Sequence, residues 1–248
     1  MKDRLEYFKV SLFENKHLYI ISTFTFLLIY LSTFNKAYGY FIDEFYYIAC
    51  ANNPAFGYVD HPPLAPLLLT IFQFVFGNSV YAIRFLPALA AAAAVFYTGI
   101  LTKEIGGNKF AQLLAACSLA AMPVTISFGT FYSMNAFEPL LAALLFLVAT
   151  RMIKSENYKL WIHAGVIMGL GVMNKHTFGV FIIALLLALV LSGKWRLLLN
   201  RWFILGGIIS TLIFLPNIIW QILNDIPSPE FYRNISVDKN VYTHQLHF

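Results

Sequence analysis

Residues 80–102 read VYAIRFLPALAAAAAVFYTGILT, an apolar run whose one charged residue is Arg84. A helix needs about 20 mostly apolar residues to cross the hydrocarbon core of a bilayer, and this run is long enough. Its alanine-rich centre, Ala88 to Ala94, is typical of a helix face that packs closely against another helix. The stretch therefore predicts a membrane-spanning helix.

Comparable apolar runs recur on both sides of this stretch, separated by short polar breaks. Of the 248 residues, 59% are apolar and 12% are charged, and the mean hydropathy of +0.69 exceeds that of a soluble globular domain. We therefore expect an all-α, polytopic membrane helix bundle that forms one domain over residues 1–248. Its spans number about seven: Leu18–Phe34, Val80–Thr102, Phe110–Phe128, Phe137–Ile153, Leu160–Met173, Phe178–Leu191 and Trp202–Trp220.

The segment after the first span differs from the rest of the chain. Asn35–Pro63 is too rich in Asp, Asn, Gly, Pro and His to lie in lipid, which predicts an extramembrane loop. Leu64–Phe76 is apolar but short and contains Pro66, so we expect an interfacial or re-entrant helix there. The first span itself should persist as an anchor, because no clear signal-peptide cleavage site follows it and more spans come after it.

Lysine and arginine gather on one side when the spans are threaded alternately. That side is cytoplasmic by the positive-inside rule, and it includes the N-terminus. The residues concerned are Lys2, Arg4, Lys9, Lys16, Lys103, Lys109, Arg151, Lys154, Lys159, Lys194, Arg196 and Arg201. Their dispersal between apolar runs favours this topological role over nucleic-acid binding, despite a pI near 9.1 and a net charge of +5.

The same threading sends a set of polar residues to the outer ends of the helices and the outer loops. Polar groups that border apolar spans are costly unless they face water or one another, so the set predicts one outward-facing polar site. Its members are Asp43, Glu44, Asp60, His61, Arg84, Asn135, Glu138, Asn174, Lys175 and His176. The alternative is that helix ends simply carry polar residues.

Two acids stand side by side in the aromatic segment FIDEFYY, residues 41–47. Consecutive helical side chains diverge by about 100°, so at most one of Asp43 and Glu44 would act as a general base while the other binds or braces. Acids are also favoured in the first turn of any helix, which is the structural alternative.

The DHPP motif at 60–63 holds Asp60 and His61 on a backbone that two prolines make extended and rigid. Such a presentation suits a binding site, although prolines also simply end loops and begin helices. Arg84 lies at the outer end of its span, where a guanidinium needs an anionic partner or a substrate phosphate, or else snorkels to the headgroups.

Two further groups complete the candidate site. Lys175 and His176 form a cationic pair at an outer junction, contrary to the positive-inside bias. Asn135 and Glu138 precede an apolar span, where a helix-capping role is the alternative. Acids combined with cations suit group transfer from an anionic leaving group: a base activates the acceptor, and cations stabilise the developing phosphate charge. Cys50 and Cys117 form no metal or disulfide pattern.

With these residues in hand, the chain resembles the GT-C superfamily. The similarity is to polyprenyl-phosphate-sugar glycosyltransferases of the family 39/83 type, related to protein O-mannosyltransferases and lipid A aminoarabinose transferases. The motifs that carry it are DE at 43–44, DHPPL at 60–64, AIRFLP at 82–87, MNAFEPL at 134–140 and GVMNKH at 171–176.

This resemblance implies transfer of a hexose or pentose from an undecaprenyl- or dolichyl-phosphate carrier to a lipid, glycan or protein acceptor. The reaction would take place at the outer face of a plasma membrane, expected to be a bacterial inner membrane. Asp43 would be the base or an acceptor-binding carboxylate, Arg84 and Lys175 would contact the lipid phosphate, and His61 stands where some relatives carry Lys. The other substrate-binding candidates are Glu44, Asp60, Asn135, Glu138 and His176.

The resemblance assigns no metal ligand and leaves a need for a divalent metal open. Relatives are usually about twice as long, so the chain is expected to be an N-terminal portion. A secondary transporter is one alternative, but its charges would lie near the bilayer midplane on repeated halves. A noncatalytic lipid-binding subunit is another, and it would tolerate Asp43→Asn far better than an enzyme.

Overall fold

The computed structural model describes residues 14–34 and 39–238. Within them the chain is helical and contains no strand, which confirms the all-α class. The helices are α2 (Lys16–Ser32), α3 (Ile42–Asn52), α4 (Leu64–Phe76), α5 (Val80–Glu104), α6 (Lys109–Ala121), α7 (Pro123–Thr130), α8 (Glu138–Ser155), α9 (Leu160–Asn174), α10 (Gly179–Leu191), α11 (Arg201–Leu223) and α12 (Pro227–Asp238). Short 3₁₀ helices occur at η1 (Met134–Ala136), η2 (His176–Phe178) and η3 (Trp195–Leu198). Lys2, Arg4, Lys9 and positions 35–38 of the predicted loop lie outside the described residues.

All seven predicted spans fall on helices, but the count of seven spans is not confirmed. Among the described residues, three helical stretches are long and apolar enough to cross a membrane: α5, η1 with α8, and α11. Helices α6 and α7 qualify together as a fourth, bent by 58°. The break falls at Pro123, which lacks an N–H to continue α6 and instead begins α7. Helices α2, α9 and α10 are shorter than this criterion requires.

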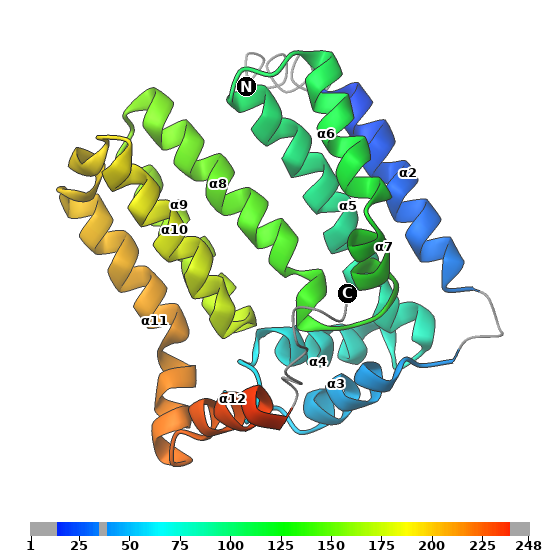
Figure 1. The fold of residues 1–248 in the computed structure, drawn as a ribbon. Coiled ribbons are helices and arrows are strands. Elements are labelled where there is room, and N and C mark those ends of the chain that lie inside the picture. Colours follow the sequence, from blue (N-terminus) through cyan, green and yellow to red (C-terminus); the bar gives the residue numbers. More distant parts are fainter. Residues whose placement is uncertain (1–13, 35–38, 239–248) are drawn as a thin grey trace, which may run out of the picture.

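The long helices run side by side, and α3, α4 and α12 lie across one end of the bundle (Figure 1). Helix α5 is central: it packs against α2, α6, α7 and α8, while α9 packs against α8 and α11. The alanine-rich stretch of α5 is buried at Ala88, Ala90, Ala91, Ala92 and Ala94, as the sequence predicts. The helix predicted at Leu64–Phe76 is α4, with the same bounds.

The chain reverses between α11 and α12, and this turn brings α12 back across the end of the bundle. Asp225 and Ile226 both adopt positive φ angles, of 61° and 51°. The N–H of Ile226 donates to the carbonyl of Gln221 at 2.7 Å, which satisfies one of the last carbonyls of α11. Nothing in the apolar pattern of α11 indicated where α12 would lie.

Glycine lets α9 and α11 approach each other closely. A Cβ placed on Gly206 would lie 2.4 Å from the carbonyl oxygen of Trp161, and one on Gly165 would lie 2.2 Å from the carbonyl oxygen of Gly206. Small residues at such positions are how membrane helices gain close backbone contact. A Cβ on the adjacent Gly207 would meet no atom within 4 Å, so this residue marks the open side of α11.

We expect Gly206→Ala to lower the thermal unfolding temperature in detergent, because the added methyl group collides with the α9 backbone; overpacking of this kind costs about 1–3 kcal/mol. Gly207→Ala is the matched control. It should leave the unfolding temperature unchanged or slightly raised, since alanine is the better helix former. Circular dichroism during heating measures both, and equal unfolding temperatures would contradict the close α9–α11 contact.

Candidate functional site

The nine candidate site residues lie on elements that meet at the end of the bundle covered by α3, α4 and α12 (Figure 1). They belong to α3, to the segment between α3 and α4, to the first turns of α5 and α8, to η1, and to the junction between α9 and η2. Direct contacts divide seven of them into three groups. The first is Glu44 with Arg84, the second is Asp60 with His61, and the third is Lys175 with Asn135 and Glu138. His176 joins the second group through Tyr232.

Helix α3 begins with two acids that face different surroundings. The Glu44 side chain is fully buried, and its carboxylate accepts a hydrogen bond from the N–H of Phe41 at 2.7 Å. Asp43 is exposed. Because adjacent helical residues diverge by about 100°, burial of Glu44 turns Asp43 toward the surface. Within the described part of the chain, no hydrogen bond or ion pair engages the Asp43 carboxylate.

Glu44 and Arg84 form a buried, two-pronged ion pair. Arg84 donates from Nη2 to Oε2 at 2.6 Å and from Nε to Oε1 at 2.9 Å, the paired geometry in which guanidinium–carboxylate contacts are strongest. The backbone N–H of Tyr132 adds a third donor at 3.1 Å, and Arg84 also donates to the carbonyl of Gly39. The pair therefore ties α3 to α5 and to the segment before α8. The phosphate contact expected of Arg84 stays a prediction.

Asp60 and His61 sit among tyrosines. The Tyr46 hydroxyl donates to Asp60 Oδ1 at 2.5 Å, and the His61 ring stacks on the Tyr47 ring with centroids 5.1 Å apart. His61 is 1% exposed, its Nδ1 is 2.8 Å from the carbonyl oxygen of Pro62, and its Nε2 lies 4.0 Å from Asp60 Oδ1. Burial lowers the pKa of His61, so the imidazole is neutral at pH 7. The His61 side chain is therefore both neutral and buried in this conformation.

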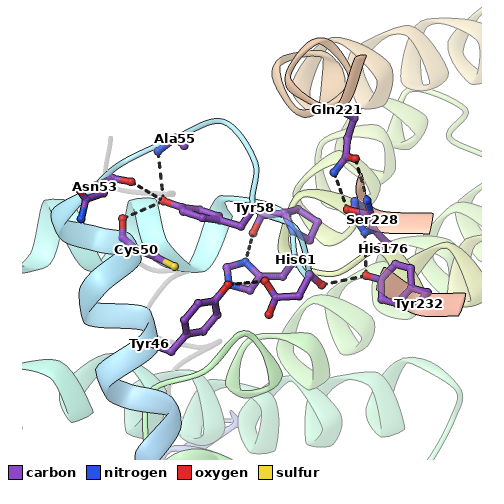
Figure 2. A network of polar contacts seen from close by, with 12 residues as sticks. Tyr46, Cys50, Asn53, Ala55, Tyr58, His61, His176, Gln221, Ser228 and Tyr232 are labelled. Carbon is purple, nitrogen blue, oxygen red and sulfur yellow. Dashed lines mark hydrogen bonds and ion pairs between the residues drawn. The ribbon is translucent and has the colours of Figure 1, made fainter. Parts of the chain in front are cut away.

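A hydrogen-bond network joins this segment to α11 and α12 (Figure 2). The Tyr232 hydroxyl donates to the backbone carbonyl of Asp60 at 3.1 Å and lies 3.0 Å from Nδ1 of His176. His176 Nε2 is 3.3 Å from Oδ1 of Asn217, and the Asn217 amide donates to the carbonyl of Phe56 at 2.9 Å. The network thus fixes α12 over the segment that carries Asp60.

A pocket of about 330 Å³ lies between α11 and α12, next to His176. Its wall is mainly apolar, with Phe214, Ile218 and Ile222 on α11, and Tyr232 and His176 supply polar atoms. An apolar cavity with a few polar groups at its edge is the usual form of a small-molecule or lipid site.

Lys175 is the centre of the third group. Its ammonium donates to Oδ1 of Asn135 at 2.9 Å and to Oε2 of Glu138 at 3.1 Å, and the Thr177 hydroxyl donates to the other Glu138 oxygen at 3.4 Å. The Lys175 side chain is 25% exposed. The sequence predicted that these residues share one end of the bundle, and the structure brings them into direct contact.

Electrostatic coupling links Asp43 with the group that contains Asp60, through the hydroxyl of Tyr47. Burial raises the pKa of Tyr47, a hydrogen bond with the backbone of Met134 opposes this rise, and the charges of Asp60 and Asp43 add to it. Burial likewise lowers the pKa of His176, and its hydrogen bond with Asn217 opposes this fall. The contacts of Asp60 with His61, and of Tyr232 with both Asp60 and His176, join these residues into one connected polar region.

Sequence reasoning missed three residues of this region. Asn217 is a fully buried polar residue inside an otherwise apolar predicted span, and that mismatch was a usable signal. Tyr46 and Tyr232 gave no such signal, because aromatic residues are common at membrane interfaces. Within residues 14–34 and 39–238, no group of three or more His, Cys, Asp or Glu side chains is placed to hold a metal ion.

We expect Glu44→Gln to lower stability sharply, because it leaves the buried guanidinium of Arg84 without a counter-charge; breaking a buried pair costs about 3–5 kcal/mol. Asp43→Asn removes the same charge one residue earlier, at an exposed position, and should leave the unfolding temperature unchanged. Thermal unfolding of the two detergent-solubilised variants decides the matter. Equal unfolding temperatures would contradict the bracing role of the pair.

One family model matches the chain, over residues 60–220, and its description is dolichyl-phosphate-mannose-protein mannosyltransferase. No curated protein and no solved structure is significantly similar to the chain. The match covers more than half of the sequence and includes seven of the nine candidate residues. It confirms the GT-C resemblance: the chain belongs to the dolichyl-phosphate-mannose-protein mannosyltransferase family, whose members are membrane glycosyltransferases that use polyprenyl-phosphate sugar donors.

Proposed function

We propose that the protein forms one transmembrane domain that transfers a hexose or pentose from a polyprenyl-phosphate carrier to a lipid, glycan or protein acceptor. The reaction takes place at the outer face of a plasma membrane, a bacterial inner membrane. One observation carries the proposal: of two neighbouring acids, Glu44 is buried in an ion pair, whereas Asp43 is exposed and has no partner among the described residues. That division leaves one carboxylate available for chemistry beside a polar region.

Asp43 acts as the general base in this proposal. Its carboxylate takes the proton of the acceptor hydroxyl as the acceptor oxygen bonds to the anomeric carbon of the sugar. The bond from that carbon to the phosphate oxygen breaks, and the polyprenyl phosphate leaves with the electron pair. Glu44 and Arg84 hold the start of α3 in place, so the position of Asp43 does not depend on its own contacts.

Lys175 is the cation best placed for the carrier phosphate. An ammonium group has three N–H donors, and two of those of Lys175 are used by Asn135 and Glu138 within the described chain. The third is available to a phosphate oxygen, where the charge would stabilise the leaving group as it develops. Arg84 is better suited to bracing, since Glu44 already compensates its charge.

The expected outcome for Asp43→Asn is a transfer rate about 10² to 10⁴-fold lower, with donor binding retained, because asparagine keeps the shape of aspartate but cannot accept the proton. The assay follows transfer of radiolabelled sugar from a polyprenyl-phosphate donor in membranes that contain the full chain, together with binding of that donor. Glu156→Gln is the control: it removes an exposed acid in the turn between α8 and α9, at the opposite end, and should not change the rate.

Near-normal transfer by Asp43→Asn would eliminate Asp43 as the base. Donor binding by the unaltered chain without any transfer would favour a noncatalytic lipid-binding subunit and contradict the proposal.

A further inference from the structure

A second charged surface lies at the opposite end of the bundle from the candidate site. It comprises Lys159, Lys194, Trp195, Arg196, Arg201 and Trp202, here named the inner basic patch. The residues come from the position before α9, from η3 with its preceding residue, and from the start of α11. All four cations are exposed, and Trp195 is 47% exposed. Neither the family match nor the proposed reaction gives this surface a role.

The backbone that carries the patch is anchored. The fully buried Trp161 donates from its indole N–H to the carbonyl of Leu197 at 2.8 Å, which fastens η3 to α9. The Asn200 side chain accepts from the N–H groups of Trp202 and Phe203 and caps α11. The surface is therefore preformed and does not depend on a ligand to order it.

Cations and indole rings alternate within the patch. The ammonium of Lys159 lies 5.8 Å and the guanidinium of Arg201 lies 5.0 Å from the centre of the Trp202 ring, and Arg196 lies 5.9 Å from that of Trp195. These distances are within the range of cation–π attraction. They also place two positive charges around one ring, a concentration that attracts an anion.

Among the described residues, the cations of the patch lack acidic partners, unlike their neighbours. Other cations at the same end have acidic or carbonyl partners: Lys103 pairs with Glu14 at 2.9 Å, and Arg151 with Glu104 at 2.7 Å. Across residues 14–34 and 39–238, the four cations of the patch have no carboxylate within ion-pair distance.

The positions of the cations on their helices are also unfavourable without an anion. Lys159 and Arg201 stand at the N-termini of α9 and α11, where the helix dipole is positive. Neither helix has an acid in its first turn. An external anion would relieve this repulsion.

We propose that the inner basic patch binds the phosphate headgroup of an anionic membrane phospholipid. The patch lies where a span meets the membrane surface, since α11 is long and apolar enough to cross the bilayer and Arg201 is its first residue. Tryptophans favour the headgroup level, and clustered basic residues beside a span attract anionic lipids. The site is distinct from the donor site, because it lies at the other end of α9 and α11 from His176 and Asn217.

The test compares phosphatidylglycerol with phosphatidylcholine as the bound lipid. The full chain is placed in mixed nanodiscs or micelles of the two lipids, and native mass spectrometry counts the molecules retained. We expect the unaltered chain to prefer phosphatidylglycerol and the double variant Arg196→Gln/Arg201→Gln to lose about tenfold or more of that preference. The control Lys103→Gln/Arg151→Gln removes two charges at the same end and should retain it.

A second measurement does not require a variant. Phosphatidylglycerol with brominated chains near the headgroup should quench the tryptophan fluorescence of the unaltered chain more than brominated phosphatidylcholine does, and high salt should remove the difference. Equal retention of phosphatidylglycerol by the patch and control variants, or equal quenching by the two lipids, would overturn the proposal.

Discussion

The buried ion pair between Glu44 and Arg84 is the interaction on which the candidate site depends. Its carboxylate accepts hydrogen bonds from two nitrogens of the guanidinium and from the backbone of Phe41 and Tyr132. Removing a carboxylate from water costs free energy, and attraction to one opposite charge seldom offsets that cost. Here four hydrogen-bond donors compensate for it. Since these donors come from α3, from α5 and from the segment before α8, one carboxylate sets the position of the layer that covers this end of the bundle.

Two consequences follow for the chemistry. The first is that Asp43 points to the surface because its neighbour is held inside. The second is that the segment with Asp60 and His61 is held from two directions, by the tyrosines of α3 and by Tyr232 of α12. A general base must be held in position by groups that do not themselves react. The layer formed by α3, α4 and α12 is folded before substrate binds and can hold Asp43 in this way.

The sequence predicted the helical class, the bounds of α4, the close packing of the alanine stretch and the gathering of nine polar residues at one end. These features depend on apolar runs and on the alternation of spans across the membrane. Both can be read from residues that are close together in the sequence. It did not predict that Arg84 and Glu44 pair with each other, that His61 is buried, or that Asn217 and Tyr232 join the network. Those contacts depend on how distant helices pack, which no local pattern records. The count of seven spans was not confirmed, because Pro123 breaks one run and because α2, α9 and α10 are short.

The proposed function requires that the two ends of the bundle face opposite sides of the membrane, with the Asp43 end outside and the inner basic patch inside. The most direct measurement is labelling of single cysteines in intact cells with a membrane-impermeant maleimide, in a background where Cys50 and Cys117 are replaced by alanine. Asn52, on α3, and Ser192, between α10 and η3, are exposed positions at the two ends. We expect Asn52→Cys to be labelled in intact cells and Ser192→Cys to be labelled only after the membrane is permeabilised. Labelling of Ser192→Cys in intact cells, with Asn52→Cys protected, would contradict this orientation.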